Sequence, residues 1–185
     1  MLESLVRPMC QTVFLDAIAK ACARVVTANQ MTAIALMVGV VAAITLDFGF
    51  ITAAVIVLIL SGVCDALDGS IARVRGESSA VGTLFDIISD RIVECAIVIA
   101  LFLVNPVARA LPSIVMLASI FLCVTAFLVV GAVVKEHDGH KGFFYSRGLI
   151  ERFEAFIFFI AMMLFPAQFM VLAYVLSALV LLTAA

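Results

Sequence analysis

Four aspartates gather within a short stretch of a very apolar sequence, at positions 65, 68, 86 and 90. Asp65 and Asp68 are three residues apart, and Asp86 and Asp90 are four apart, so each pair lies on one face of a helix. We expect the segment between the pairs to reverse the chain, which allows the two faces to converge at one depth. Charge inside a bilayer is costly and usually marks function. The spacing therefore predicts one site built from carboxylates.

Divalent metal ions would stabilise such a group. Crowded aspartates repel one another and take up protons unless a cation lies among them. Mg²⁺ and Mn²⁺ prefer oxygen ligands, and two ions a few ångströms apart can share a carboxylate site. Gly69 and Ala72 leave room for a ligand, Gly82 permits close approach, and Arg73 offers a forked set of donors for phosphate. We predict two ions, Mg²⁺ or Mn²⁺, beside a phosphate-binding surface.

A purely structural role for the aspartates is the alternative. The arginines at positions 73, 75 and 91 could neutralise them at the membrane interface. A single aspartate near a helix end often has such a role, but four in this spacing, flanked by small residues, favour the functional interpretation.

The composition shows which class of protein carries this site. Of the 185 residues, 66% are hydrophobic and 13% are charged, and the mean hydropathy is +1.31. A soluble domain has about a quarter charged and about half apolar residues, so a soluble globular protein is excluded. The five cysteines are scattered without metal-binding spacing and fit reduced packing residues. We expect the lipid bilayer as the surroundings and no nucleic-acid partner.

Six apolar stretches are long enough to cross a membrane, since a span needs about 20 mainly apolar residues. Ahead of them, residues 10–26 combine apolar and charged side chains at helical spacing, which is typical of an amphipathic helix in the interface. We therefore predict one all-α integral membrane domain over residues 1–185. The expected spans are at about residues 31–46, 50–73, 82–104, 113–134, 149–165 and 168–183.

Basic residues predict the orientation of these helices. With six crossings, all basic residues except Arg109 fall on one side of the membrane, and positive charge favours the cytoplasmic side. We expect both termini and the aspartates on that side, of the inner membrane if the protein is bacterial. No cleavable signal peptide opens the sequence, in agreement with a cytoplasmic N-terminus. The basic residues on that side are Arg7, Lys20, Arg24, Arg73, Arg75, Arg91, Lys135, Lys141, Arg147 and Arg152.

Residues 65–90 match the pattern D-x₂-D-G-x₂-A-R-x₈-G-x₃-D-x₃-D at all of its eight fixed positions. This pattern resembles the signature of the CDP-alcohol phosphotransferases, and the six-span layout extends the resemblance over nearly the whole chain. The resemblance implies a metal-dependent enzyme of phospholipid biosynthesis. Such an enzyme transfers a phosphatidyl group from a CDP-linked lipid, such as CDP-diacylglycerol, to an alcohol and releases CMP. The resemblance also implies a homodimer.

The resemblance further implies roles for individual residues. Asp65, Asp68 and Asp86 resemble the metal ligands, and Asp90 resembles both a ligand and the base that takes the acceptor's proton. A set of six positions resembles the contacts to the CDP donor: Asn29, Thr32, Asp65, Gly69, Arg73 and Ser79. For the Asn29–Thr32 segment, a simple helix N-cap is the alternative.

The acceptor side is predicted from a second likeness. Residues 148–154 read Gly-Leu-Ile-Glu-Arg-Phe-Glu and resemble a stretch in family members that use inositol phosphate or glycerol phosphate. This implies that Lys135, Arg147 and Arg152 bind the phosphate of the acceptor. Ala155 stands where the inositol-phosphate type has an arginine, and no basic residue follows Arg152. The alternative is that these basic residues only anchor the chain at the cytoplasmic interface.

Two other functions compete with catalysis. A divalent-cation transporter would use the carboxylates as its path and would place acids at two depths, whereas here they gather at one end of the helices. A non-catalytic membrane scaffold of the same fold would not need the complete motif. We therefore predict an enzyme.

Overall fold

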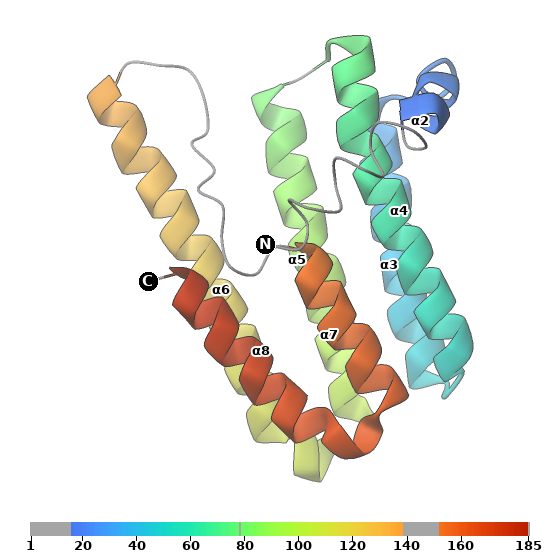
Figure 1. Cartoon of the computed structure of the whole chain (residues 1–185), viewed down its shortest axis with the longest axis vertical. Helices are drawn as coiled ribbons and strands as arrows, with labels where there is room; N and C mark the ends of the chain where they lie inside the picture. Colours follow the sequence, from blue (N-terminus) through green and yellow to red (C-terminus); the bar gives the residue numbers. More distant parts are fainter. Residues whose placement is uncertain (1–15, 78, 139–151, 185) are drawn as a thin grey trace. The chain divides into compact units, whose positions relative to one another are not determined.

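The computed structural model describes residues 16–77, 79–138 and 152–184 of the chain. These residues form helices and no strand, as predicted (Figure 1). The chain divides into two compact units, residues 2–105 and 106–185, which are described separately below. The helices are α2 (Asp16–Cys22), α3 (Ala28–Asp47), α4 (Ile51–Arg75), α5 (Ala80–Leu103), α6 (Pro106–Asp138), α7 (Arg152–Leu164), the short 3₁₀ helix η2 (Pro166–Gln168) and α8 (Phe169–Ala184).

Most predicted helix ends lie within three residues of the observed ones, but the fourth predicted span is an exception. The prediction of a break over residues 105–112 is wrong, because α6 begins at Pro106 and includes Pro112. At the first helical position the fixed φ angle of proline already matches the helix. Proline has no backbone N–H, and an N–H at that position would have no partner within the helix. The predicted interfacial helix ends at Cys22 rather than at residue 26, and its residues 10–15 lie outside the described part.

The first unit is built around α3, which packs against both α4 and α5 (Figure 1). Close approach depends on Gly39 of α3, since a Cβ atom there would lie 2.5 Å from Val93 Cγ2 and 2.9 Å from Ser61 Oγ. Ser61 of α4 also donates a hydrogen bond to the Ala35 carbonyl of α3, over 2.8 Å. These contacts fix the spacing of the three long helices of this unit.

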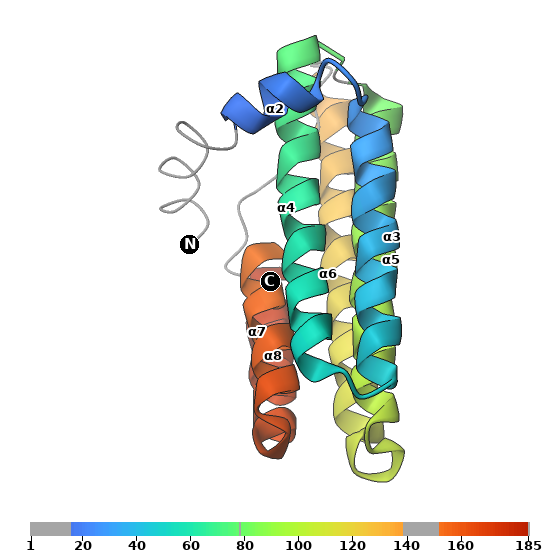
Figure 2. The same ribbon diagram turned by 90° about the vertical axis from the view of Figure 1, so that its right-hand side faces the viewer.

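The short helix α2 packs against α4 and runs across it (Figure 2). Its Ala19 is buried in a small core with Met31, Leu67 and Ile71 of α3 and α4. Lys20 and Ile18 are both exposed, and the place of this helix in the membrane interface stays a prediction.

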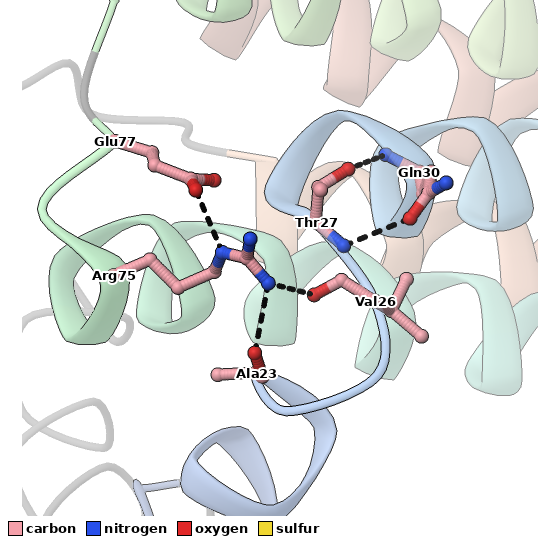
Figure 3. A network of polar contacts seen from close by, with 6 residues as sticks. All are labelled: Ala23, Val26, Thr27, Gln30, Arg75 and Glu77. Carbon is pink, nitrogen blue, oxygen red and sulfur yellow. Dashed lines mark hydrogen bonds and ion pairs between the residues drawn. The ribbon is translucent and has the colours of Figure 1, made fainter.

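An arginine at the end of α4 holds the connection between α2 and α3. Arg75 Nη1 donates to the carbonyls of Ala23, at 2.8 Å, and Val26, at 3.4 Å, and Arg75 Nε lies 2.9 Å from Glu77 Oε1 (Figure 3). Because α2 ends just before these carbonyls, the guanidinium supplies donors that the helix no longer provides. The start of α3 is thereby tied to the end of α4.

In the second unit, α8 packs against both α6 and α7. Arg109 near the start of α6 is buried, with its guanidinium 4.3 Å from the centre of the Phe169 ring and its Nη2 donating to the Pro166 carbonyl at 3.4 Å. Stacking on an aromatic face suits a weakly hydrated guanidinium. This one arginine thus joins α6 to the turn that precedes α8.

Four helices in the described part of the chain are long and apolar enough to cross a membrane: Ala28–Asp47, Ile51–Arg75, Pro106–Gly131 and Pro166–Ala184. A shorter apolar helix covers Phe153–Leu164. The chain is therefore an integral membrane protein.

Candidate active site

The structure brings three of the four motif aspartates together. Asp65 and Asp68 lie on α4 and Asp86 lies on α5, and one carboxylate oxygen of each is within 4.8 Å of the others. The two helix faces therefore converge as the spacing predicts. Asp68 is 6% exposed, whereas Asp65 and Asp86 are half-buried. Three oxygen donors at this separation suit a hard divalent cation, so the residues present fit the metal that the motif implies.

Asp90 does not belong to this group of three. It lies one turn beyond Asp86 on α5 and is half-buried. Residues four apart share one face of a helix, so Asp90 and Asp86 lie on the same side of α5. Its predicted roles as ligand and base stay predictions.

A threonine from α3 completes the surroundings of Asp68. Thr32 Oγ1 donates a hydrogen bond to Asp68 Oδ2 over 2.6 Å, and Thr32 is 4% exposed. The sequence predicts Thr32 as a contact of the CDP donor, and the structure pairs it with an aspartate of the cluster. Nothing in the linear sequence pointed to this pair, because the two residues are separated by 36 positions.

An open pocket of about 430 Å³ lies where α3 and α5 begin, and it is lined by Thr27, Ala28, Asn29, Glu77 and Ser79. It contains two of the residues predicted to bind the donor, Asn29 and Ser79. Helix N-termini carry free N–H groups and a partial positive charge, so two of them at one pocket favour a phosphate-bearing ligand. Glu77 adds an acidic group to the wall, which the sequence analysis did not consider.

Each of these two helix starts has its own cap. Thr27 caps α3 in a reciprocal pair with Gln30: Thr27 N donates to Gln30 Oε1 at 2.9 Å, and Gln30 N donates to Thr27 Oγ1 at 3.3 Å (Figure 3). The segment 29–32 therefore takes part in the cap of α3 through Gln30, although the N-cap residue itself is Thr27. The T-x-x-Q spacing of a capping box would have identified Thr27 from the sequence. Ser79 caps α5 by accepting from Gly82 N at 3.0 Å.

Gly82 is closely surrounded by the donor-binding candidates. A Cβ atom there would lie 3.0 Å from Asn29 Oδ1 and 3.1 Å from Ser79 Oγ. The close approach that the sequence predicts for this glycine thus brings α5 next to the first turn of α3. Gly69, by contrast, is exposed, and the nearest atom to a Cβ there would be Arg73 Nη1 at 3.9 Å. Open space beside Gly69 is consistent with a ligand against α4.

The arginines near the aspartates make contacts of their own. Arg73 Nη2 donates to Ser70 Oγ at 2.8 Å, and Arg75 contacts Glu77. Arg91 forms a two-pronged ion pair with Glu94, with N–O distances of 2.7 and 2.8 Å. Sequence reasoning missed the buried Glu94, although the Arg-x-x-Glu spacing on a helix indicates such a pair. Arg75 and Arg91 therefore have acidic partners outside the aspartate cluster.

The predicted acceptor residues lie mostly beyond what the structure describes. Lys135 belongs to α6 and Arg152 is the first residue of α7, but their side chains are outside the described part. Arg147 falls in the segment 139–151, which is outside it altogether. Their role in acceptor binding stays a prediction.

Comparison with known proteins identifies the family. The sequence model of the CDP-alcohol phosphatidyltransferases matches residues 25–185. The inner membrane protein YnjF of Escherichia coli K12 is 31% identical over 150 residues, which cover 78% of this chain and 72% of that protein.

Two solved structures of Mycobacterium tuberculosis phosphatidylinositol phosphate synthase (PgsA1) share the fold at 22% sequence identity. The one with CDP-DAG bound has a TM-score of 0.74 over 92% of this chain and 89% of its own. The one in complex with manganese and citrate has a TM-score of 0.73 over 92% and 85%.

The family match covers nearly all of the chain and includes the aspartates, the two capped helix starts and the apolar helices described above. It favours an enzyme over the cation transporter and the scaffold that the composition alone left open. The chain belongs to the CDP-alcohol phosphatidyltransferase family and is an integral membrane transferase of phospholipid biosynthesis.

Proposed function

We propose that the protein transfers a phosphatidyl group from a CDP-linked lipid, such as CDP-diacylglycerol, to a hydroxyl acceptor and releases CMP. The observation that carries this proposal is the convergence of Asp65, Asp68 and Asp86, together with the pocket at the starts of α3 and α5. Asn29 of the pocket precedes Thr32 by three residues, and Gly82 precedes Asp86 by four. Along α3 the pocket thus lies one turn from Thr32, which donates to Asp68, and along α5 about two turns separate Ser79 from Asp86.

The family and one structural neighbour support a CDP-linked donor. The family is named for CDP-alcohols, and one structural neighbour was solved with CDP-DAG. The two helix N-termini at the pocket favour a diphosphate, and Arg73 at the end of α4 can add a charged donor to its oxygens. We assign Asn29, Ser79, Gly69 and Arg73 to the donor.

We assign the metal site to Asp65, Asp68 and Asp86, with Asp90 as a further ligand, for two ions of Mg²⁺ or Mn²⁺. The other structural neighbour was solved with manganese. Bound there, divalent ions would neutralise the charge of the diphosphate and of the CMP leaving group. The carboxylates of α4 and α5 would hold these ions at a fixed place, which would orient the donor relative to the attacking hydroxyl.

The reaction itself needs a base. The acceptor oxygen attacks the phosphorus of the phosphatidyl group, the P–O bond to CMP breaks, and CMP leaves with the bonding electrons. Asp90 takes the proton that the acceptor hydroxyl loses, because it lies one turn from Asp86 on the same face of α5.

For the acceptor we propose a phosphorylated polyol, glycerol 3-phosphate or inositol phosphate, bound by Lys135, Arg147 and Arg152. The Gly148 to Glu154 stretch supports this choice. Guanidinium groups bind phosphate in a two-pronged manner, and a cationic pocket repels the ammonium of choline.

For the topology we propose six spans with the site and both termini in the cytoplasm, and a homodimer as the assembly. The helix α5 has 24 residues and extends about 36 Å, which is enough to cross a bilayer core of about 30 Å even though it carries charged residues. The described part of α7 is shorter, with 13 residues.

The test is CMP release from CDP-diacylglycerol by the purified protein, with and without Mn²⁺, across a panel of alcohols and phosphorylated polyols. We expect CMP only when Mn²⁺ or Mg²⁺ and a suitable acceptor are both present. Full activity in excess chelator would contradict the assignment of a metal to the aspartates. The absence of CMP with every acceptor would contradict the proposed donor.

A further inference from the structure

We propose that Thr32 is a positioning residue of the metal site, and that its hydroxyl holds Asp68 in the orientation in which this carboxylate binds a cation. This inference rests on the proposed function, since it needs the metal at the aspartates. It assigns Thr32 to the metal rather than to the nucleotide of the donor.

The geometry of the contact supports a strong interaction. The distance of 2.6 Å between Thr32 Oγ1 and Asp68 Oδ2 falls in the range of hydrogen bonds from a hydroxyl to an ionised carboxylate. Both residues are almost fully buried, so water does not compete for the contact. With Oδ2 engaged by α3, the carboxylate of Asp68 cannot rotate freely about its last bond.

The hydroxyl has one proton and two acceptors within reach. The second acceptor is the Ala28 carbonyl, one turn back on α3, at 3.1 Å. An ionised carboxylate is the stronger acceptor and the closer one, and it has no proton of its own to donate. A cation at the cluster requires Asp68 to be ionised. The Thr32 hydroxyl therefore donates its hydrogen bond to Asp68 whenever a cation is bound at the aspartates.

Both partners are held in place by their neighbours along the chain. Met31 and Leu67, which precede Thr32 and Asp68, are buried in the same small core as Ile71. The start of α3 is further fixed by the Thr27–Gln30 cap and by the hold of Arg75 on the preceding carbonyls. Because both residues are anchored, side-chain motion rarely breaks this hydrogen bond. A contact that positions a metal ligand must be stable in this way.

The rival role for Thr32 is a contact with the cytidine of the donor. The pocket at the starts of α3 and α5 is lined by Thr27, Ala28 and Asn29 of this segment. Thr32 lies one turn deeper and is buried against α4. Within this segment, Asn29 is therefore the residue that can contact the nucleotide, and Thr32 is the residue that contacts the metal ligand Asp68.

The experiment measures Mn²⁺ binding by electron paramagnetic resonance, on purified protein in detergent without nucleotide. Thr32→Val keeps the shape and removes the hydroxyl, whereas Thr32→Ser keeps the hydroxyl. Thr45→Val is the matched control, because Thr45 of the same helix donates to the Val41 carbonyl at 2.7 Å. If Thr32→Val does not fold, as judged by gel filtration and thermal melting, Thr32→Ala serves in its place.

We expect the Kd for Mn²⁺ to rise about 10- to 100-fold in Thr32→Val, the usual cost of losing a partner of a metal ligand. Thr32→Ser and Thr45→Val should stay close to wild type. In the CMP assay, Thr32→Val should raise the apparent KM for Mn²⁺ and keep most of kcat at saturating Mn²⁺.

Two results would overturn the inference, and they differ from each other. An unchanged Kd for Mn²⁺ in Thr32→Val, with a raised KM for the CDP donor, would make Thr32 a nucleotide contact and leave the proposed function intact. Absence of Mn²⁺ binding by the wild-type protein would overturn the metal site and this inference with it.

Discussion

Asp65, Asp68 and Asp86 share one site but differ in their surroundings. Asp68 is buried and hydrogen-bonded to Thr32, whereas the other two are half-buried. A buried carboxylate has less water to stabilise its charge, so it depends more on the cation and on its hydrogen-bond donor. Within the proposed site, Asp68 is therefore the aspartate that tolerates substitution least.

Replacement of any of the three aspartates by asparagine should stop the reaction. Asparagine keeps the size but removes the charge that a divalent cation needs, so we expect CMP release to fall by more than about 10²-fold and Mn²⁺ binding to weaken. The measurement is the CMP assay together with Mn²⁺ titration. Asp47→Asn, at the opposite end of α3, is the control and should behave as wild type. Normal turnover in Asp65→Asn, Asp68→Asn or Asp86→Asn would contradict the proposed role of that residue as a metal ligand.

Asp90→Asn separates chemistry from binding. The variant loses the proposed base, so we expect CMP formation to drop by roughly 10²-fold or more, the usual contribution of a positioned base. Binding of the CDP donor should survive better than in Asp68→Asn, because Asp90→Asn leaves the group of Asp65, Asp68 and Asp86 intact. Donor Kd and single-turnover rates measure the two effects. Near-normal turnover would place the base elsewhere.

Arg152→Ala tests the acceptor side. If the guanidinium binds the phosphate of a polyol phosphate, its loss should raise the acceptor KM sharply, by roughly tenfold or more, and leave the donor KM nearly unchanged. Arg24→Ala, an exposed basic residue of the same predicted side, is the control. Turnover with serine or choline and none with either polyol phosphate would instead reduce Lys135, Arg147 and Arg152 to membrane anchors.

At the scale of residues, the sequence predicted the convergence of the aspartates because helical spacing and the complete motif both demand it. It did not predict the Thr32–Asp68 contact. That contact depends on the register between α3 and α4, which is fixed by tertiary packing such as the Ser61 hydrogen bond and the close approach at Gly39. Such packing leaves no periodic signal in the sequence.

At the scale of elements, the site depends on two helices that begin at the same pocket. The first turn of α3 carries Asn29, and the first turn of α5 carries Gly82 next to its cap Ser79. The absent side chain of Gly82 is what allows Asn29 and Ser79 to lie so close together. The shape of the pocket that we propose for the donor therefore depends on the distance between two helix ends.

Gly82→Ala should disturb this pocket. The added methyl group would meet Asn29 Oδ1 at 3.0 Å and Ser79 Oγ at 3.1 Å, so both side chains must shift by a few tenths of an ångström. We expect the KM for the CDP donor to rise roughly tenfold, because small displacements of positioning groups are costly. Gly131→Ala is the matched control, since no atom of the residues that the structure describes lies within 4 Å of a Cβ there. An unchanged donor KM would contradict the assignment of this pocket to the donor.

The predicted helices mostly agree with the observed ones, because long apolar runs bounded by turn residues are easily recognised. The predicted fourth span begins at residue 113, whereas α6 begins at Pro106. Proline at a helix start is well tolerated, and Pro112 lies inside the helix. The end of α2 was also misplaced. The chain after Cys22 is held by Arg75, which donates to the Ala23 and Val26 carbonyls from a distant position in the chain, a contact that the local sequence does not indicate.

At the scale of the whole molecule, the proposed topology makes a prediction for fusion proteins. With an even number of spans and a cytoplasmic N-terminus, the C-terminus lies in the cytoplasm. A C-terminal green fluorescent protein should therefore fluoresce in a bacterial host, and a C-terminal alkaline phosphatase should be inactive. Fusions after Asn105, between α5 and α6, should show the reverse. Active phosphatase at the C-terminus would contradict six spans with this orientation.

The division of the chain into two compact units has a consequence for how this enzyme can change over evolutionary time. The aspartates and the pocket belong to residues 2–105, while the basic residues proposed for the acceptor belong to residues 106–185. If these basic residues select the acceptor as proposed, mutations in the second half can alter which alcohol is used without passing through variants that have lost the donor chemistry. The inheritance of a new head-group specificity would require changes in only one half of the gene.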